Sequence, residues 1–249
     1  MEKFVSTFLF KMMACCFCIA QIPYLNASAN SEEKAVPESY LNELQMELQK
    51  EWPDNRTMNI VFHGHSVPSG YGVSPQVNKL GAYPNQVFVG LVNHYPTAVL
   101  NVITTSIGGE HSEDGLSRFE NEVLNHHPDV LFIDYALNDR MIGLKRAEQA
   151  WRKMIEIALD KGIKVILMTP TPDLSEDILS QDAPLQGYAE MIHKLAGEYH
   201  VGLVDSYQAF KDIASSGEKL DSYMAQFNHP NSKGHEIVAH EILKWFNVR

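Results

Sequence analysis

The sequence predicts an α/β protein in which helices cover both faces of a central parallel sheet of about five strands, a three-layer αβα sandwich. Three observations predict this class. Apolar runs and amphipathic stretches alternate along the 249 residues. The apolar runs are continuous in Val, Ile and Leu, which is typical of strands buried on both faces. Each amphipathic stretch supplies the crossover that a parallel connection needs.

The predicted strands are short apolar runs that stop at glycine or at polar residues. They span residues 59–64, 99–106, 130–136, 164–169 and 202–205. The predicted helices show apolar residues at helical spacing. They span residues 40–48, 84–93, 113–125, 146–160, 185–198 and 233–246. In such sheets functional groups gather at the carboxyl ends of the strands, beside the topological switch point.

Residues 1–29 are predicted to be a signal peptide. Lysines precede an uncharged run, residues 12–20, and small residues follow at Ala27 and Ala29. The apolar run is too short to cross a bilayer, so no stable membrane span is expected after processing. Residues 13–15, Met-Ala-Cys, approximate a lipoprotein signal poorly, which leaves lipidation as the alternative. We expect soluble export, to the periplasm or outside the cell.

The remaining chain is predicted to contain a tether and a helix, residues 30–57, and a single domain, residues 58–249. All three cysteines lie inside the predicted leader, so a processed protein would have no disulfide, thiolate metal site or cysteine nucleophile. The formal net charge at pH 7 is −11. No basic stripe offers contacts to phosphates, which argues against nucleic acid as a partner.

Four residue types that acyl transfer needs lie near the predicted strand ends. Ser66 follows the first strand, Gly109 lies in a glycine turn after the second, Asn138 follows the third, and His229 precedes the last helix. A hydroxyl attacks well only when a base removes its proton, and histidine titrates in the right range. The N–H groups of Ser66 and Gly109 with the Asn138 amide would form the oxyanion hole. This chemistry needs no cofactor.

These residues carry a resemblance to the SGNH, or GDSL-like, hydrolase superfamily, which extends over residues 58–246. Gly64-His65-Ser66 matches the family's first block, Gly109 with its neighbours resembles the second, Asn138-Asp139 the third, and His229-Pro230 the fifth. The resemblance implies a flavodoxin-like sheet and ester hydrolysis. The roles expected of the matching residues are nucleophile for Ser66, base for His229, and oxyanion donors as named above.

Two positions depart from the family's pattern. The Asp usually found before the nucleophile is His65, and the Asp usually found three residues before the histidine is Gln226. Replacing the acid of a serine protease triad by an amide costs about 10⁴ in rate, largely through the wrong imidazole tautomer. We expect a backbone carbonyl or Gln226 to orient His229, with Asp221 or Asp205 as alternatives from outside the motif.

The function expected from this sequence is a serine esterase that removes small acyl groups, acetyl above all, from carbohydrates. Export, the acidic composition and the absence of an apolar lid segment fit a small acyl group on a polar alcohol, and the step to carbohydrate rests on the resemblance. His65, Glu110 and Arg140 are candidate substrate contacts. One alternative is a lipolytic or aryl esterase of the same fold. Another is a glycan- or acyl-binding protein in which Gln226 reflects lost catalysis.

A histidine-rich metallohydrolase is the remaining alternative. His63 and His65 lie two apart at a strand end and could bind zinc with His111 or His229, because imidazole suits that metal. The sequence lacks a clear pattern of carboxylate ligands, and Ser66 is the next residue along the chain. Both features favour hydrogen-bonding roles for these histidines, so no metal is expected.

Overall fold

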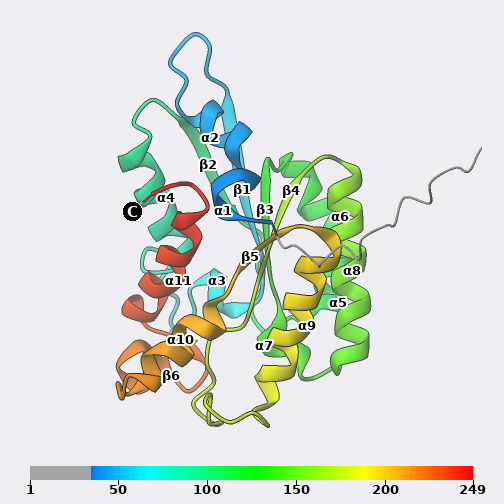
Figure 1. The fold of residues 1–249 in the computed structure, drawn as a ribbon, viewed down its shortest axis with the longest axis vertical. Coiled ribbons are helices and arrows are strands. Elements are labelled where there is room, and N and C mark those ends of the chain that lie inside the picture. Colours follow the sequence, from blue (N-terminus) through cyan, green and yellow to red (C-terminus); the bar gives the residue numbers. More distant parts are fainter. Residues whose placement is uncertain (1–34, 249) are drawn as a thin grey trace, which may run out of the picture. The chain divides into compact units, whose positions relative to one another are not determined.

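A computed structural model describes residues 35–248, in which helices cover both faces of a five-stranded parallel sheet (Figure 1). The strand order is β2-β1-β3-β4-β5, which is the flavodoxin-like order. The predicted three-layer αβα sandwich is therefore confirmed. The predicted signal peptide and the first part of the tether lie outside the described residues.

The strands occur where the apolar runs predict them, but four of them end earlier than predicted. They are β1 (Thr57–Gly64), β2 (Val99–Thr104), β3 (Val130–Asp134), β4 (Lys164–Met168) and β5 (Gly202–Val204). After β3 the chain turns at once, because the N–H groups of Asn138 and Asp139 both bond to the carbonyl of Tyr135. Residues predicted as the end of a strand thus begin a helix that carries Asn138.

The helices include several short pieces that the sequence pattern does not predict. The α-helices are α1 (Pro37–Tyr40), α2 (Asn42–Leu48), α3 (Ser66–Ser69), α4 (Tyr83–His94), α5 (Ser112–Ser117), α6 (Phe119–Glu122), α7 (Ala136–Asp139), α8 (Leu144–Asp160), α9 (Pro184–Tyr199), α10 (Ser206–Ser215) and α11 (Ser232–Lys244). Two 3₁₀ turns, η1 (Leu124–His126) and η2 (Leu220–Tyr223), and a small hairpin of β6 (Met224–Gln226) and β7 (His229–Pro230) complete the fold. The single helix predicted over 113–125 is wrong, since α5, α6 and η1 divide that segment.

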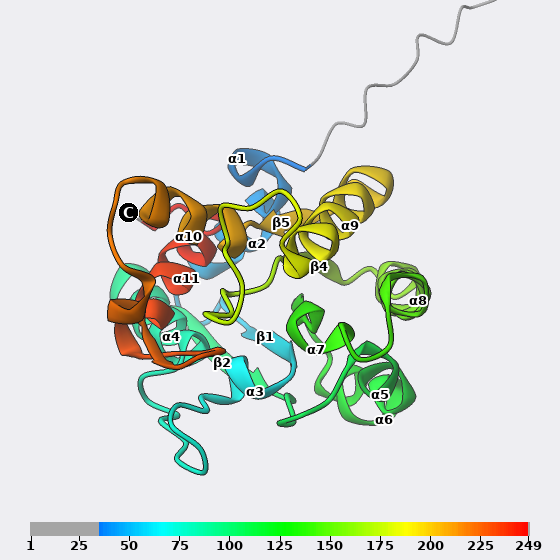
Figure 2. The ribbon, with the colours of Figure 1, turned by 90° about the horizontal axis from the view of Figure 1, so that it is seen from below.

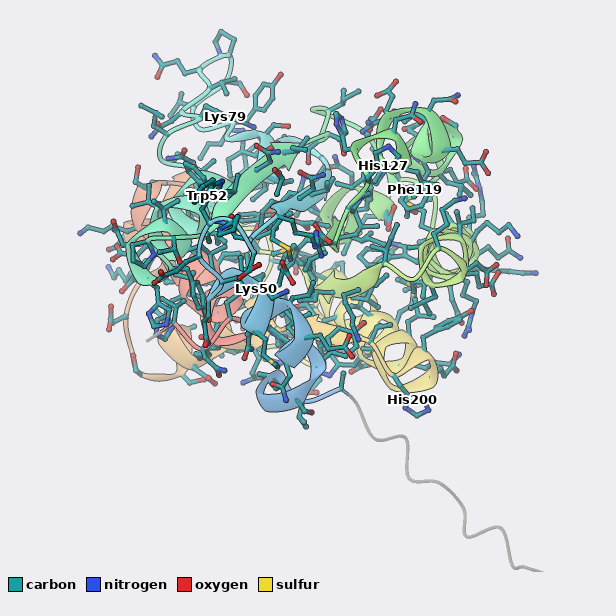
Figure 3. The ribbon with its side chains drawn as sticks, turned by 90° about the horizontal axis from the view of Figure 1, so that it is seen from above. Lys50, Trp52, Lys79, Phe119, His127 and His200 are labelled. Carbon is teal, nitrogen blue, oxygen red and sulfur yellow. The ribbon has the colours of Figure 1, made fainter. Side chains whose placement is uncertain are left out.

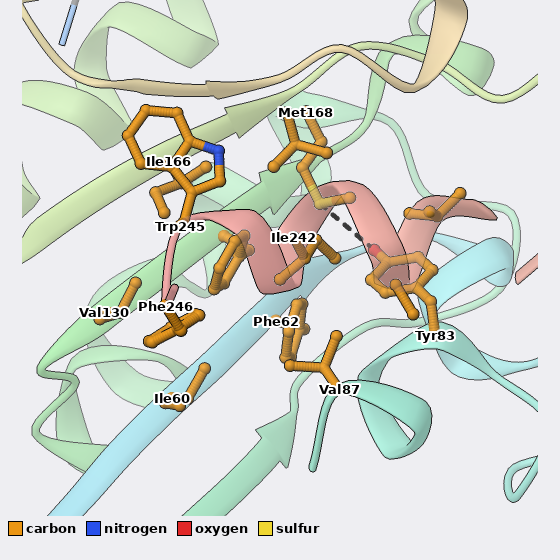
Figure 4. Close-up of a cluster of buried hydrophobic side chains, with 14 of the residues drawn as sticks. Ile60, Phe62, Tyr83, Val87, Val130, Ile166, Met168, Ile242, Trp245 and Phe246 are labelled. Carbon is orange, nitrogen blue, oxygen red and sulfur yellow. Dashed lines mark hydrogen bonds between the residues drawn. The ribbon is translucent and has the colours of Figure 1, made fainter. Parts of the chain in front are cut away.

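Strands β1, β3 and β4 bury alternate residues in two separate cores, which explains their continuous apolar sequences. In β1, Ile60 and Phe62 join one core and Val61 joins the other. Figures 1 and 2 show α4 and α11 on one side of the sheet and α5, α6, α8 and α9 on the other. On the α11 side, Trp245 and Phe246 pack over the strands (Figure 4).

The two ends of the sheet carry different chemistry. Figure 2 looks onto the carboxyl ends of the strands, where α3 and α7 lie. Figure 3 looks onto the opposite end, where His127 and His200 lie in the turns before β3 and β5. Those two histidines are therefore remote from Ser66, which follows the carboxyl end of β1. Within residues 35–248, no helix combines the length and the apolar character needed to span a bilayer.

Candidate active site

Ser66 is the first residue of α3 and lies where β1 gives way to a helix at the switch point of the sheet. Strands β2 and β3 flank β1 on opposite sides, which is the position at which α/β sheets bind ligands. The turn needs Gly64, because a Cβ there would come within 2.3 Å of the Asp134 carbonyl oxygen. The serine hydroxyl is thereby held at the edge of the sheet.

The Ser66 hydroxyl faces the imidazole of His229. Oγ of Ser66 lies 2.9 Å from Nε2 of His229, although the two residues are 163 positions apart. Each residue is 7% exposed. Burial lowers the pKa of His229 below its ordinary value, so the ring is neutral near pH 7 and its Nε2 is able to accept a proton. The structure thus brings together the nucleophile and base expected from the sequence.

Two groups compete for the other ring nitrogen of His229, and they favour opposite tautomers. The Gly72 carbonyl oxygen lies 3.0 Å from Nδ1 and accepts a hydrogen from it, which leaves Nε2 free to receive the serine proton. The Gln226 amide nitrogen lies 2.8 Å from Nδ1, and its donation there would place the hydrogen on Nε2 instead. The Gln226 side chain is held in this orientation because its oxygen accepts from the Ser74 N–H at 3.1 Å. The productive tautomer therefore depends on the Gly72 carbonyl.

The two remaining candidates for orienting His229 are engaged elsewhere or lie apart from it. Asp205 caps α10 and pairs with His193 at 2.5 Å between Oδ2 and Nε2. Asp221 lies in η2. In the part of the chain that the structure describes, no hydrogen bond or ion pair joins either carboxylate to His229.

Three hydrogen-bond donors lie at this end of the sheet: the N–H groups of Ser66 and Gly109 and the side-chain amide of Asn138. Gly109 has a φ of +84° in the exposed turn after β2, a region that favours glycine. Asn138 of α7 donates its amide to the Glu110 carbonyl at 2.9 Å, which ties α7 to this turn and leaves a second amide hydrogen. Among residues 35–248, no hydrogen bond uses the N–H of Ser66 or of Gly109. Both N–H groups are free to bind an oxyanion.

Comparison with known proteins places this geometry in a family. The GDSL-like Lipase/Acylhydrolase family matches residues 62–237. The chain belongs to this family. It is accordingly a carboxylic ester hydrolase, and the expected resemblance to SGNH hydrolases is confirmed.

Two curated proteins and several solved structures are similar to this GDSL-like hydrolase. The chain is 28% identical to the uncharacterized lipoprotein YqeF of Bacillus subtilis, over 63% of this chain and 78% of YqeF. It is 26% identical to an acetylxylan esterase of Geobacillus stearothermophilus, over 73% of this chain and 87% of the esterase.

The structural matches concern the fold. The crystal structure of Axe2, an acetylxylan esterase from Geobacillus stearothermophilus, matches with a TM-score of 0.67 and 21% identity, over 77% of this chain and 95% of Axe2. A two-domain esterase, CEX, active on acetylated mannans, matches with a TM-score of 0.69 and 20% identity, over 84% of this chain and 52% of CEX. At these identities the matches show that the GDSL-like hydrolase shares the fold of both esterases.

In this GDSL-like hydrolase, Glu110 lies in a partly buried ion pair behind the Gly109 turn. Arg118 donates from Nε to both carboxylate oxygens of Glu110, at 2.9 and 3.0 Å, and from Nη2 at 2.5 Å. A further bond runs from Nη1 of Arg118 to the Thr105 carbonyl at 2.6 Å. The Glu110 carboxylate is thus engaged by Arg118, and its contact with substrate stays a prediction. Arg118 was not singled out by sequence reasoning, because no motif names it.

His63 lies beside this ion pair and is itself fully buried. Its ring lies 3.2 Å from the Tyr135 hydroxyl and 2.9 Å from the Thr105 hydroxyl. Burial, followed by the charge of Arg118, lowers the pKa of His63 to about 3, so this ring is neutral. Over the described residues, no group of three or more His, Cys, Asp or Glu side chains is arranged as metal ligands.

Arg140 and Asp139 hold the loops around α7. Arg140 donates to Asp173 at 2.5 Å and so ties α7 to the loop after β4. Asp139 accepts from the Ser112 N–H and from the Trp151 indole, both at 2.7 Å, which joins α7 to α5 and α8. Arg140 as a substrate contact stays a prediction. Asp139 could have been identified from the sequence, because it follows Asn138 directly in the third block of the family's motifs.

Proposed function

We propose that this chain is an exported serine esterase that removes acetyl groups from carbohydrates, with Ser66 as nucleophile and His229 as base. The observation that carries the proposal is the 2.9 Å contact between Ser66 Oγ and His229 Nε2, with the Gly72 carbonyl on the far side of the ring. A serine hydroxyl, a neutral imidazole and an acceptor behind it are the parts that nucleophilic acyl transfer needs.

The reaction follows from these positions. His229 Nε2 takes the Ser66 proton while Oγ attacks the ester carbonyl, and the carbonyl oxygen becomes an oxyanion. The N–H groups of Ser66 and Gly109 and the Asn138 amide stabilise that charge, each donor contributing about 3 kcal/mol. His229 then gives the proton to the leaving alcohol, and a water molecule, deprotonated by the same ring, hydrolyses the acyl-enzyme.

Support for a short acyl group comes from the crowding beside His229. The ring of Tyr71 lies with its centroid 6.0 Å from that of His229. A Cβ on Gly108 would come within 3.0 Å of the Tyr71 ring, so this side chain packs directly against the glycine turn. The carbohydrate part of the proposal rests on the relatives, one named for acetylxylan and one described as active on acetylated mannans.

Export is part of the proposal. It is supported by the leader predicted for residues 1–29 and by YqeF, a relative that is named a lipoprotein. Polymeric acetylated substrates are met outside the cytoplasm, so an enzyme of this specificity would act in the periplasm or outside the cell.

The deciding experiment measures turnover of acetylated xylo- and manno-oligosaccharides and of p-nitrophenyl acetate and octanoate. We expect acetyl esters to be preferred, Ser66→Ala and His229→Ala to lose at least about 10³ in kcat/KM, and a fluorophosphonate to label Ser66. The exposed residues Ser216 and His240 provide matched controls, Ser216→Ala and His240→Ala.

Two of the alternatives, a lipolytic enzyme and a binding protein, have their own signatures in this experiment. Preference for octanoate would favour a lipolytic enzyme. An absence of both turnover and fluorophosphonate labelling in the folded protein would favour a binding protein. Undiminished turnover by Ser66→Ala would remove the proposed mechanism.

A further inference from the structure

Three buried polar residues lie beneath Ser66 and have no part in the proton transfers above. His65, the residue before the nucleophile, is 1% exposed, and Asp134 at the end of β3 is 4% exposed. Nε2 of His65 lies 3.4 Å from Oδ1 of Asp134. The other oxygen of Asp134 accepts the hydroxyl of Tyr83, which is fully buried, at 2.9 Å. A chain of polar contacts thus runs from α4 through the sheet to the nucleophile.

The contacts of His65 fix its tautomer. Nδ1 accepts the Val67 N–H at 3.2 Å and so caps the first turn of α3. Because Nδ1 accepts, the hydrogen of the neutral ring must be on Nε2, which faces Asp134. No group within residues 35–248 makes a well-formed hydrogen bond to that nitrogen. The carboxylate of Asp134 is the charge that compensates the buried N–H.

The same imidazole touches the nucleophile. Nδ1 of His65 lies 3.4 Å from Oγ of Ser66, farther than Nε2 of His229 at 2.9 Å. Asp134 is paired in register with Gly64, so the backbone of β3 and the turn before Ser66 move together. Displacement of His65 would therefore shift the Ser66 hydroxyl and the Ser66 N–H at the same time.

We propose that His65, held by Asp134, is a positioning residue that sets the Ser66 hydroxyl and its N–H for attack, and that the two side chains are matched in charge. This inference rests on the proposed role of Ser66. The GDSL-like family usually has Asp at position 65. Here a carboxylate at that position would face the buried carboxylate of Asp134, and like charges at close range in a buried site disfavour each other. Histidine at 65 and aspartate at 134 form the compatible pair.

The test compares Asn and Asp at position 65, since both side chains cap helices well and differ mainly in charge. The variants are His65→Asn, His65→Asp, Asp134→Asn and the two double variants. Each is assayed for kcat and KM with p-nitrophenyl acetate and for the rate of fluorophosphonate labelling of Ser66, and thermal unfolding is followed in parallel.

We expect His65→Asn to lower kcat and the labelling rate about fivefold with little change in KM, and His65→Asp to lower them about tenfold further. In the Asp134→Asn background, the ratio of kcat between His65→Asn and His65→Asp should shrink to about twofold or less.

Equal rates for His65→Asn and the wild type would overturn the inference. So would a ratio of kcat between His65→Asn and His65→Asp that is the same with Asp134 and with Asp134→Asn. A fall in thermal stability without a fall in labelling rate would assign His65 a structural role only. Ser66→Ala separates the two proposals. Turnover retained by Ser66→Ala would overturn the proposed function and, with it, the role given to His65. If Ser66→Ala is inactive, the variants at position 65 decide between a positioning role and a structural role for His65.

Discussion

At the residue scale, position 226 shows how one side chain can leave a fold intact while it changes the chemistry. Gln226 reaches Nδ1 of His229 at 2.8 Å, the place where the family has a carboxylate. An amide nitrogen there donates, whereas a carboxylate accepts, so the substitution opposes the tautomer that the Gly72 carbonyl supports. The sequence showed that the acid was missing. It did not show that a backbone carbonyl lies 3.0 Å away, because that depends on the path of the loop after α3.

The variant Gln226→Glu should therefore improve the enzyme. A carboxylate of the same length accepts the Nδ1 hydrogen, selects the productive tautomer and stabilises the imidazolium, so we expect kcat/KM at pH 8 to rise about tenfold. A nearby negative charge raises the pKa of His229, so the acidic limb of the pH profile should move up by about one pH unit. A profile of kcat/KM from pH 4.5 to 9 checks both. Lower activity with an unchanged limb would contradict the role given to position 226.

Gly109 offers a second prediction with a close control. Its φ is +84° and a Cβ would meet nothing within 4 Å, so Gly109→Ala brings backbone strain without a clash. Strain of about 1 kcal/mol should lower stability, and a turn that relaxes should lower kcat about tenfold by moving the oxyanion donor. Gly217 has a φ of +89° and equal free space between α10 and η2. Gly217→Ala should show the same loss of stability and full activity; equal kcat in both variants would count against the oxyanion role.

At the scale of elements, the broken helix after β2 shows where periodicity misleads. The apolar spacing over 113–125 predicts one helix, but the chain leaves helical geometry at Arg118, with φ −110° and ψ 5°. From that position the guanidinium reaches Glu110 and the Thr105 carbonyl. Gly115 packs so closely on Tyr135 that a Cβ would come within 2.3 Å of its hydroxyl. Tertiary contacts that fix the Gly109 turn thus outweigh local propensity.

Arg118→Lys should expose this role. Lysine keeps the charge but loses the forked pairing with Glu110 and the bond to the Thr105 carbonyl. We expect kcat with p-nitrophenyl acetate to fall about tenfold as the Gly109 turn loosens, with a small change in KM. Arg146 forms an exposed pair with Glu113 on α5, and Arg146→Lys should leave both constants unchanged. Equal effects of the two substitutions would show that the pair behind the turn has no special role.

The elements that carry most of the site are also the shortest. α3 and α7 have four residues each, and β7 has two. Such pieces contain too few residues for a period of 3.6 or 2 to be detected. The sequence could nevertheless place Ser66, Asn138 and His229 near one another, because each follows a strand or precedes a helix that is long enough to recognise. The motifs identified the residues, and the predicted parallel sheet indicated that they lie at the same end of the strands.

At the scale of the whole molecule, the strand order determines where the chemistry occurs. The alternation of apolar runs and amphipathic stretches predicts a parallel sheet, but it does not specify that β1 lies between β2 and β3. That order creates the switch point beside Ser66. It also buries charged and polar side chains beneath the site, including Asp134 and His235, each less than 5% exposed. These groups bear on the stability of the entire fold.

Two buried histidines should make the fold sensitive to acid. Burial lowers the pKa of His63 to about 3 and that of His235 to about 4, whereas an unfolded histidine has a pKa near 6.5. Between the folded and unfolded values the unfolded chain binds more protons. The contribution of the two neutral histidines to stability is therefore complete above about pH 6.5. Below that pH the free energy of unfolding falls by about 1.4 kcal/mol per pH unit for each histidine.

Urea unfolding between pH 5 and 6.5 measures this slope. His235→Asn keeps an acceptor for the Tyr83 N–H, which His235 Nδ1 binds at 3.3 Å, and removes one titrating group. At neutral pH we expect this variant to be less stable than the wild type. As the pH falls, its free energy of unfolding should decrease by about 1.4 kcal/mol per pH unit less than that of the wild type. His240 is exposed on α11, so His240→Asn should keep the wild-type slope. A slope in His235→Asn as steep as that of the wild type would mean that the buried ring is already protonated in the folded protein.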